Sequence, residues 1–478
     1  MNRQQRRAAI KASGPSSADD AALLAEQARS ALAQGNTRVA LPLLRRMVKI
    51  RPEEGVFWHA LGQALVADGR PGEAAAAFDK ACRLQPGDCS CLLDLGAARQ
   101  EMGRFDEAED IYRKVPADDP GFPAAQGKLA SVLKAREKYE EALAAQTVAV
   151  AGNPDDPQER FNLALLLLAL GRFDDGWEAY EARLRIPGLD IHTGFRQPQW
   201  TGENLSGKTL LVHGEQGLGD MIQFVRYLPL LAGRAERILL AVPPMLVELL
   251  RDLPGVDALL TGQGPAPSFD YHCPLLSLPR AFGTRLDSIP ADIPYLHADP
   301  KRVALISQRF SVLAEPAIKV GLVWAGQSRS HNRQAHQMDL LRSMRLSDFA
   351  PLARESGVRF VSLQKGEAAA QAKKPPGGLV LFDPMSRIDD FSDTAAIIAH
   401  LDLVITVDTA VAHLAGALGK PVWILSRFDG CWRWLLGRNT SPWYPTARLF
   451  RQTKPGDWTG VMAHVAEDFA NFVGERRV

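Results

Sequence analysis

The stretch at residues 55–88, GVFWHALGQALVADGRPGEAAAAFDKACRLQPGD, decides the fold of the first part of the chain, because its pattern recurs. Residues of one type return every 34 positions in three separate series. These series are Pro52, Pro86, Pro120 and Pro154; Ala40, Ala74, Ala108 and Ala142; and Leu61, Leu95, Leu129 and Leu163. Three series with one period indicate repeated helical hairpins rather than a helical bundle with accidental periodicity.

A 34-residue period is that of the tetratricopeptide repeat (TPR), a helix–turn–helix unit. Each residue type has a physical reason in the best copy. The small Gly62 and Ala74 let the two helices of a hairpin approach closely, and the larger Trp58 and Phe78 fill the space between hairpins. The proline that follows cannot continue the second helix. The pattern therefore predicts a TPR solenoid.

We expect about five repeats over residues 21–190, after a flexible basic tail at residues 1–20. The fifth repeat is atypical, because Gly176 stands where the other copies have alanine and GWEAYEARL (176–184) continues as a helix. We interpret this repeat as a cap or a joint to the next domain. A TPR stack offers a concave surface that usually binds a peptide or protein, so a protein partner in this groove is expected.

The composition is that of an ordinary globular protein, with 46% hydrophobic and 23% charged residues among 478. Lysine plus arginine (56) nearly balance aspartate plus glutamate (55), so nucleic acid is not an expected partner. The five cysteines lack C-x-x-C spacing, which favours neither a disulfide framework nor a zinc site. Neither a secretory signal nor a membrane span is predicted. We expect a cytoplasmic protein.

After Trp200 the helical period gives way to short apolar runs that alternate with helices. Alternation of this kind predicts parallel sheets. The expected strands are KTLLVHG, RILLAVP, KVGLVWAG, VRFVSLQ, LVITVD and PVWILS. A proline-rich stretch separates two expected lobes, at residues 200–305 and 316–478, and the chain should end in a helix packed on the second lobe.

Two nucleotide-binding motifs can be excluded from their context. GENLSGKT (202–209) matches the P-loop formula, but a polar segment precedes it and a strand follows it, the reverse of a true P-loop. The G-x-G-x-x-G fingerprint of dinucleotide binding is missing after the first expected strand.

The first candidate site follows that strand at Gly217, Gly219 and Asp220. Glycines let a ligand approach the backbone, and Asp220 would stand where parallel sheets place ligands. Alternatively, Asp220 only caps the following helix, a role that suits aspartate.

The second candidate site follows the strand LVITV, at Asp408, Thr409 and His413. A helix that begins at a hydroxyl residue and points at a cleft favours a diphosphate ligand. His413 taken alone is more typical of a packed histidine. Strand ends near Gln364 face the same expected cleft, and Lys365 and Arg342 would neutralise phosphate charge or be ordinary solvated bases.

The aromatic segment GCWRWLLGRNTSPWYP (430–445) is expected to be loop-like. Its tryptophans would stack on a sugar or base if exposed, or pack in the core or at a joint.

GLGDMIQFVRYLPLL and DTAVAHLAGALGKP resemble the two motifs of bacterial heptosyltransferase-like (glycosyltransferase family 9-like) enzymes, which have two Rossmann-like lobes in the GT-B fold. The full layout is similar to bacterial TPR proteins with such a C-terminal domain, on GWEAYEARL, HGEQGLGD, VSLQKG and SPWYPTARLFRQ. By architecture it is also similar to O-GlcNAc transferases. The resemblance implies a TPR α-solenoid followed by a two-lobed GT-B domain.

The resemblance also implies residue roles. Asp220 is the expected catalytic base, and Asp408, Thr409 and His413 would surround the diphosphate of a nucleotide-sugar donor. The implied reaction is inverting hexosyl or heptosyl transfer. The chain has no D-x-D motif, which fits a reaction without metal or cofactor, in which the nucleotide-sugar is a substrate.

Two function hypotheses remain open from the sequence. In the first, the chain is a glycosyltransferase whose TPR array recruits the acceptor, either a protein such as flagellin or lipopolysaccharide. In the second, it is a TPR scaffold with a degenerate, inactive transferase domain. Ala410, where the family motif usually has glycine, and the short first lobe motivate the second hypothesis.

Overall fold

The computed structural model describes residues 17–189, 191, 194–215, 217–262, 267–327 and 333–477. Its contacts divide the chain into two units, Met1–Leu163 and Ala164–Val478. Of the expected basic tail, residues 1–16 lie outside the described residues, and residues 17–20 begin helix α2 instead.

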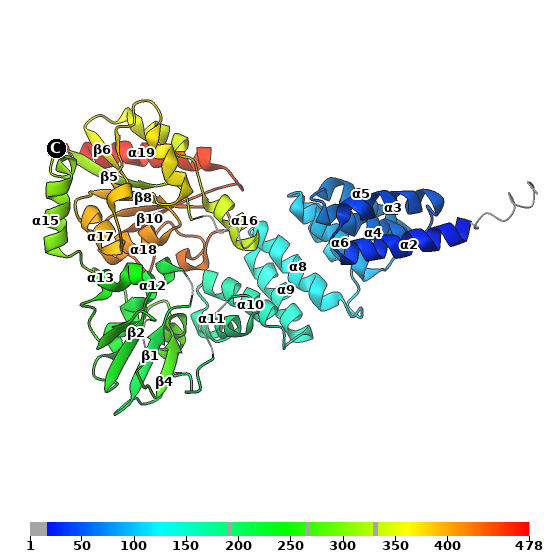
Figure 1. Cartoon of the computed structure of the whole chain (residues 1–478), viewed down its shortest axis with the longest axis horizontal. Coiled ribbons are helices and arrows are strands. Elements are labelled where there is room, and N and C mark those ends of the chain that lie inside the picture. The colour runs from blue at the N-terminus through cyan, green and yellow to red at the C-terminus, as the bar shows by residue number, and fades with distance from the viewer. Residues whose placement is uncertain are drawn as a thin grey trace, which may run out of the picture. The chain divides into compact units, whose positions relative to one another are not determined.

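In the first unit, each helix within residues 17–152 packs most closely against the helices before and after it in the sequence (Figure 1). Packing that is dominated by sequence neighbours is typical of a solenoid. The helices are α2 (Ser17–Ala33), α3 (Thr37–Ile50), α4 (Gly55–Ala67), α5 (Pro71–Leu84), α6 (Cys89–Glu101), α7 (Phe105–Tyr112), α8 (Phe122–Ala135), α9 (Tyr139–Gly152) and the start of α10 (Pro157–Ala169).

The repeated small residues hold these hairpins together. The four alanines of the 34-residue series are fully buried: Ala40, Ala74, Ala108 and Ala142. A Cβ atom added to Gly62 would stand only 2.4 Å from Cε1 of Phe78, so the close approach predicted for Gly62 is present. The turn between α4 and α5 passes through Gly69, whose φ of 76° favours glycine.

The second unit contains two separate parallel sheets. The first has the strand order β3-β2-β1-β4, and the second has the order β10-β9-β8-β5-β6-β7. The strands are β1 (Thr209–His213), β2 (Arg237–Ala241), β3 (Ala258–Leu260), β4 (Tyr271–Pro274), β5 (Ile318–Val323), β6 (Val358–Ser362), β7 (Leu381–Phe382), β8 (Leu403–Val407), β9 (Val422–Ser426) and β10 (Ala447–Arg451). All pairings within both sheets are parallel.

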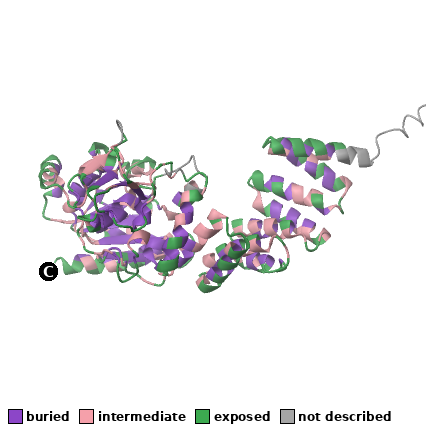
Figure 2. Ribbon diagram, turned by 90° about the horizontal axis from the view of Figure 1, so that it is seen from below, coloured by how far each residue is buried: buried purple, intermediate pink, exposed green. Residues whose placement is uncertain are grey.

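Helices and short 3-10 segments connect these strands. The helices of this unit are the end of α10, then α11 (Phe173–Tyr180), α12 (Leu218–Phe224), α13 (Val247–Leu250), α14 (Leu278–Ala281), α15 (Pro300–Arg309), α16 (Arg333–Arg342), α17 (Phe391–Ala399), α18 (Ala410–Ala417) and α19 (Trp458–Glu475). The main 3-10 segments are η1 (Glu181–Arg185), η2 (Val225–Leu231), η4 (Leu275–Ser277), η6 (Leu346–Arg354), η7 (Glu367–Lys373) and η9 (Trp432–Trp434). Figure 2 shows the buried residues concentrated along the strands.

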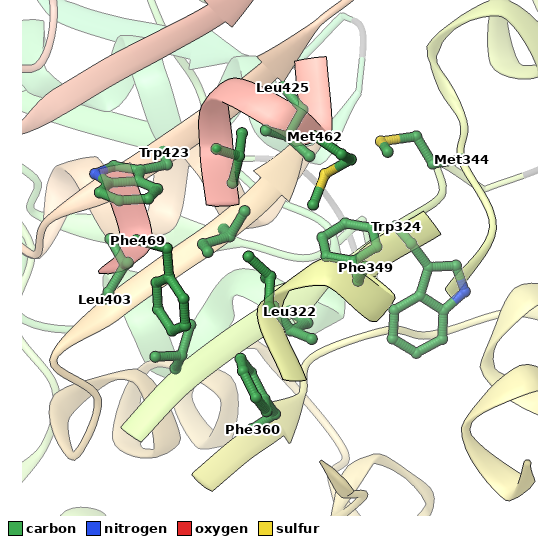
Figure 3. Close-up of a cluster of buried hydrophobic side chains, with 14 of the residues drawn as sticks. Leu322, Trp324, Met344, Phe349, Phe360, Leu403, Trp423, Leu425, Met462 and Phe469 are labelled. Atoms are coloured by element: carbon green, nitrogen blue, oxygen red, sulfur yellow. The ribbon is translucent and has the colours of Figure 1, made fainter. Parts of the chain in front are cut away.

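The second sheet and the final helix share one hydrophobic cluster (Figure 3). Val461, Val465 and Phe469 on α19 are buried there, and Phe472 packs at its margin. Trp423 on β9 stacks at an angle against Phe469, with 6.4 Å between ring centroids. The final helix thus packs back on the second lobe, as the spacing of its apolar residues predicts.

The architecture is therefore an N-terminal TPR solenoid followed by a region of parallel sheets and helices in two lobes, and this confirms the predicted fold class. Among the described residues, no helix is long and apolar enough to cross a membrane.

Candidate functional site

The two candidate motifs, far apart in the sequence, meet in the structure. Helix α12 follows β1 of the first sheet, α18 follows β8 of the second, and the two helices pack against each other. A Cβ atom added to Gly219 would stand 3.2 Å from Cα of Ala410 and 3.0 Å from Cδ2 of His413. The close approach of α18 therefore requires a small residue at position 219.

Asp220 has two contacts. Its Oδ2 accepts a hydrogen bond from the backbone N–H of Gly217, at 3.1 Å, which is the capping role considered above. Its Oδ1 lies 2.5 Å from Nη2 of Arg433, in an ion pair between the two lobes. Asp220 thus caps its helix and also faces the second lobe.

Arg433 was not identified from the sequence. It lies in η9, within the aromatic segment at 430–445, and only 8% of its surface is exposed. Burial lowers the pKa of this guanidinium, but Asp220, Cys431 and Tyr180 together outweigh the effect of burial, so the pKa is raised overall. The one sequence signal that could have identified Arg433 is its position between Trp432 and Trp434. Aromatic neighbours indicate burial, and a buried cation needs a partner.

His413 is a packed histidine in this structure. Its ring stacks on Trp434 at 5.2 Å between centroids, and its Nδ1 lies 3.0 Å from the hydroxyl of Tyr444. Burial lowers the pKa of His413 well below its ordinary value, and Arg433 and Arg226 lower it further. The ring is therefore neutral near pH 7.

The start of α18 lies beside Arg342. Thr409 is the N-cap residue, but its side chain makes no capping hydrogen bond, and its hydroxyl lies 3.0 Å from that of Thr406. Arg342 donates from Nη1 to the backbone oxygen of Asp408 at 3.1 Å, and its Nη2 lies 2.6 Å from Asp339. The structure thus brings Asp408, Thr409 and Arg342 together at the carboxyl edge of the second sheet.

Gln364 is buried and fully held by structural contacts, whereas Lys365 is exposed and makes one. Oε1 of Gln364 accepts from the backbone N–H groups of Trp324 and Ala325, and its Nε2 donates to the carbonyls of Ala325 and Lys365. This buried amide has no capacity left for a donor sugar, so its predicted ligand role gives way to fixing two strand ends. Nζ of Lys365 donates to the carbonyl of Ile388.

The aromatic segment is buried, so its rings do not form an exposed platform for a sugar or a base. Trp432 is 6% exposed and Trp443 is fully buried. Both pack against Trp177 of α11, with ring centroids 5.4 Å and 6.4 Å apart. Core packing, one of the two alternatives from the sequence, is the one that the structure contains.

The atypical fifth repeat ends inside this unit. Trp177 of α11 donates from Nε1 to the carbonyl of Thr284 in the first lobe, at 3.0 Å. Arg183 of η1 is fully buried and lies 2.6 Å from Glu215, which lies two residues after the end of β1 and two residues before Gly217. Gln216 lies outside the described residues. By their contacts, residues 164–189 pack with the second unit.

GENLSGKT has the inverted context predicted from the sequence, because β1 follows it and no helix begins at its end. Within the part of the chain that the structure describes, no three His, Cys, Asp or Glu side chains form a group that could hold a metal ion.

Comparison with known proteins supports a TPR region followed by a glycosyltransferase-like domain. Tetratricopeptide repeat models match residues 25–88, 65–132 and 128–186, and the model of glycosyltransferase family 9 (heptosyltransferase) matches residues 387–425, which include β8, α18 and β9. The latter match is short, so it supports a glycosyltransferase-like domain without establishing an activity.

Among curated proteins, the chain is 29% identical over 465 residues to Protein FlbA of Caulobacter vibrioides, covering 91% of this chain and 70% of that protein. It is 30% identical over 171 residues to Cellulose synthase operon protein C of Xanthomonas axonopodis, covering 34% of this chain but 11% of that protein. Among solved structures, MamA from Desulfovibrio magneticus is 23% identical over 35% of this chain and 93% of its own, with a TM-score of 0.31. Pseudomonas aeruginosa pilF is 19% identical over 35% of this chain and 77% of its own, with a TM-score of 0.33.

Proposed function

We propose that the chain is an inverting, metal-independent glycosyltransferase that moves a sugar from a nucleotide-sugar to an acceptor recruited by the TPR array, in the cytoplasm. The observation that carries this proposal is the meeting of α12 and α18. It places the carboxylate of Asp220 from one lobe near the start of a helix in the other, where Arg342 also lies.

The chemistry follows from these groups. Asp220 takes the proton from an acceptor hydroxyl, and the oxygen forms a bond to the anomeric carbon from the face opposite the leaving group. The bond from that carbon to the diphosphate oxygen breaks, and the diphosphate keeps the electron pair. The N–H groups at the start of α18 and the guanidinium of Arg342 stabilise the negative charge of the leaving diphosphate.

Transfer can be tested with the purified full chain and a panel of nucleotide-sugars, by titration calorimetry and by release of nucleoside diphosphate. We expect one donor to bind and turn over, and Asp220→Asn to lower the rate at least about a hundredfold while the donor still binds. His464→Gln, an exposed change on α19, is the control and should keep full activity. The proposal fails if no donor binds and Asp220→Asn alters no glycan in cells.

The acceptor is tested separately, because a TPR array is typical of protein–protein interaction. A protein acceptor such as flagellin predicts altered mass of one or more proteins in a deletion strain. A lipopolysaccharide acceptor predicts altered lipopolysaccharide and unchanged proteins. We favour the protein acceptor, since the solenoid occupies the first unit of the chain.

A second candidate function is a scaffold with an inactive transferase domain. The contacts of the site favour it specifically: Asp220 is paired with Arg433, and His413 is enclosed by Trp434 and Tyr444. Turnover of any donor that is lost in Asp220→Asn would exclude the scaffold.

A further inference from the structure

Arg433 has more hydrogen-bonding capacity than its surroundings use. A guanidinium has five N–H donors. Its Nη1 lies 3.3 Å from the sulfur of Cys431, and Nη2 lies 2.5 Å from Asp220 without hydrogen-bond geometry. Its Nε is buried and has no hydrogen-bond partner among the described residues. Buried donors without partners are costly, so these nitrogens would gain from a further hydrogen-bond acceptor.

Arg342 shares this property. Its Nε is also buried without a hydrogen-bond partner in the described part of the chain, while its other nitrogens hold Asp339 and the carbonyl of Asp408. Two incompletely satisfied guanidinium groups and the uncapped start of α18 suit an anion with several oxygens, such as a phosphate or diphosphate.

Only one of the two arginines holds the expected catalytic base. Arg433 pairs with Asp220, which is the sole carboxylate in an ion pair with it in the described residues. One carboxylate oxygen of Asp220 faces Arg433 and the other accepts a hydrogen bond from the backbone N–H of Gly217, so both oxygens are already engaged. In this arrangement Asp220 is therefore ill suited to act as a base.

We propose that Arg433 exchanges partners: it pairs with Asp220, as in this structure, and moves to the phosphate groups of the donor when these bind, which frees Asp220 to accept a proton. This inference rests on the proposed function, since it names a positioning residue for that reaction. It makes Asp220 an effective base only after the donor has bound. Arg433 acts on the acceptor hydroxyl through Asp220 alone.

The exchange can be tested without catalysis, by titrating inorganic pyrophosphate into the full chain. If Asp220 competes with the anion for Arg433, Asp220→Asn should bind pyrophosphate about tenfold more tightly than the unaltered chain. Arg433→Met should bind it about tenfold more weakly. Asp174→Asn is the matched control, because Asp174 pairs with Arg285 at 2.9 Å on an exposed part of the unit.

The double variant Asp220→Asn with Arg433→Met separates partner exchange from simple removal of a negative charge. The exchange predicts that Asp220→Asn gives no gain in affinity once Arg433 is absent. An equal gain with and without Arg433, or no gain in the single variant, overturns the proposal, as does a lack of pyrophosphate binding by every form. Circular dichroism checks folding, and Arg433→Lys provides a second, more conservative variant.

Failure of this inference is distinguishable from failure of the proposed function. If a donor turns over but the pyrophosphate affinities of the variants do not follow the predicted pattern, the partner exchange is excluded and the transferase function is retained. If the affinities follow the predicted pattern but no donor turns over, the Arg433–Asp220 pair still responds to phosphate and the transferase function is excluded.

Discussion

Burial decides what the individual side chains of the site can do. His413, Gln364 and Arg433 are all at most 8% exposed, yet they differ in how fully their polar atoms are paired. Gln364 is saturated by backbone groups, whereas Arg433 retains an unpaired nitrogen among the described residues. The residue that can still accept a ligand is thus the one that the sequence did not single out.

The neutral state of His413 leads to a prediction about pH. Its folded pKa lies well below the ordinary value near 6.5, first because of burial. As pH falls below about 6.5, the unfolded chain takes up a proton that the folded chain refuses, so stability falls by up to about 1.4 kcal/mol per pH unit. In His413→Gln we expect a smaller loss between about pH 7 and pH 5.

Urea unfolding followed by tryptophan fluorescence measures this loss, since Trp434 stacks on the ring of His413. His464→Gln, at an exposed position on α19, should keep the pH dependence of the unaltered chain. Identical pH dependence in His413→Gln and the unaltered chain would show that His413 is not the group responsible.

For single residues of the site, the sequence predicted which residue types stand at the strand ends but not which residues they contact. Sequence position identified Asp220, Asp408 and Thr409 as groups at strand ends, because the carboxyl edge of a parallel sheet follows from the order of strands. Their partners could not be predicted, since Arg433 lies 213 positions beyond Asp220 and only the tertiary fold brings them together. Saturation of Gln364 is likewise a property of three-dimensional packing.

At the scale of elements, the central strands of both sheets were predictable and the edge strands were not. The six strands expected from the sequence are present as β1, β2, β5, β6, β8 and β9. The missed strands are β3, β4, β7 and β10, of which β3 and β7 are only partly buried and have just three and two residues. Edge strands need no continuous apolar run, so they leave a weak pattern in the sequence.

The contact between α12 and α18 gives a prediction at this scale. Gly219→Ala would place a Cβ atom 3.0 Å from His413 and 3.2 Å from the backbone of Ala410. His413 is held by its stack on Trp434, so it cannot move away freely. We expect overpacking to lower the stability of the second unit by about 1–3 kcal/mol.

Gly217→Ala is the matched control, two positions earlier in the same motif. Its added Cβ atom would meet only Oδ2 of Asp220, at an ordinary 3.7 Å, and the φ of −69° suits any residue. Its expected cost is therefore smaller, about 1 kcal/mol or less. Thermal unfolding compares the two variants, and equal destabilisation would mean that the helix contact is not as close as the structure has it.

At the scale of the whole molecule, the repeats and the α/β region share a segment. Helix α10 begins in the first unit and ends in the second, and α11 is built into the second. The 34-residue period predicted the repeats, because each hairpin repeats the same local packing. It did not predict where the units divide, since this depends on the aromatic contacts of Trp177 with Trp432 and Trp443.

Arg183 joins this shared segment to the candidate site, and its loss gives the last prediction. The side chains of Arg183 and Glu215 are fully buried, and Arg183 donates from Nε and Nη2 to the two carboxylate oxygens at 2.6 Å and 2.8 Å. Arg183→Met would leave the Glu215 carboxylate buried without this cation, at a cost of about 3–5 kcal/mol in unfolding free energy. The double variant with Glu215→Gln should recover part of that loss, because the buried charge of Glu215 is then removed, although Glu181 still lacks its ion pair with Arg183. Arg280→Met removes the more exposed ion pair with Glu178 of α11 and should change unfolding little. Since Glu215 lies two residues before Gly217, Arg183→Met should also weaken pyrophosphate binding. If the shared segment is only a linker, binding and stability should both stay unchanged.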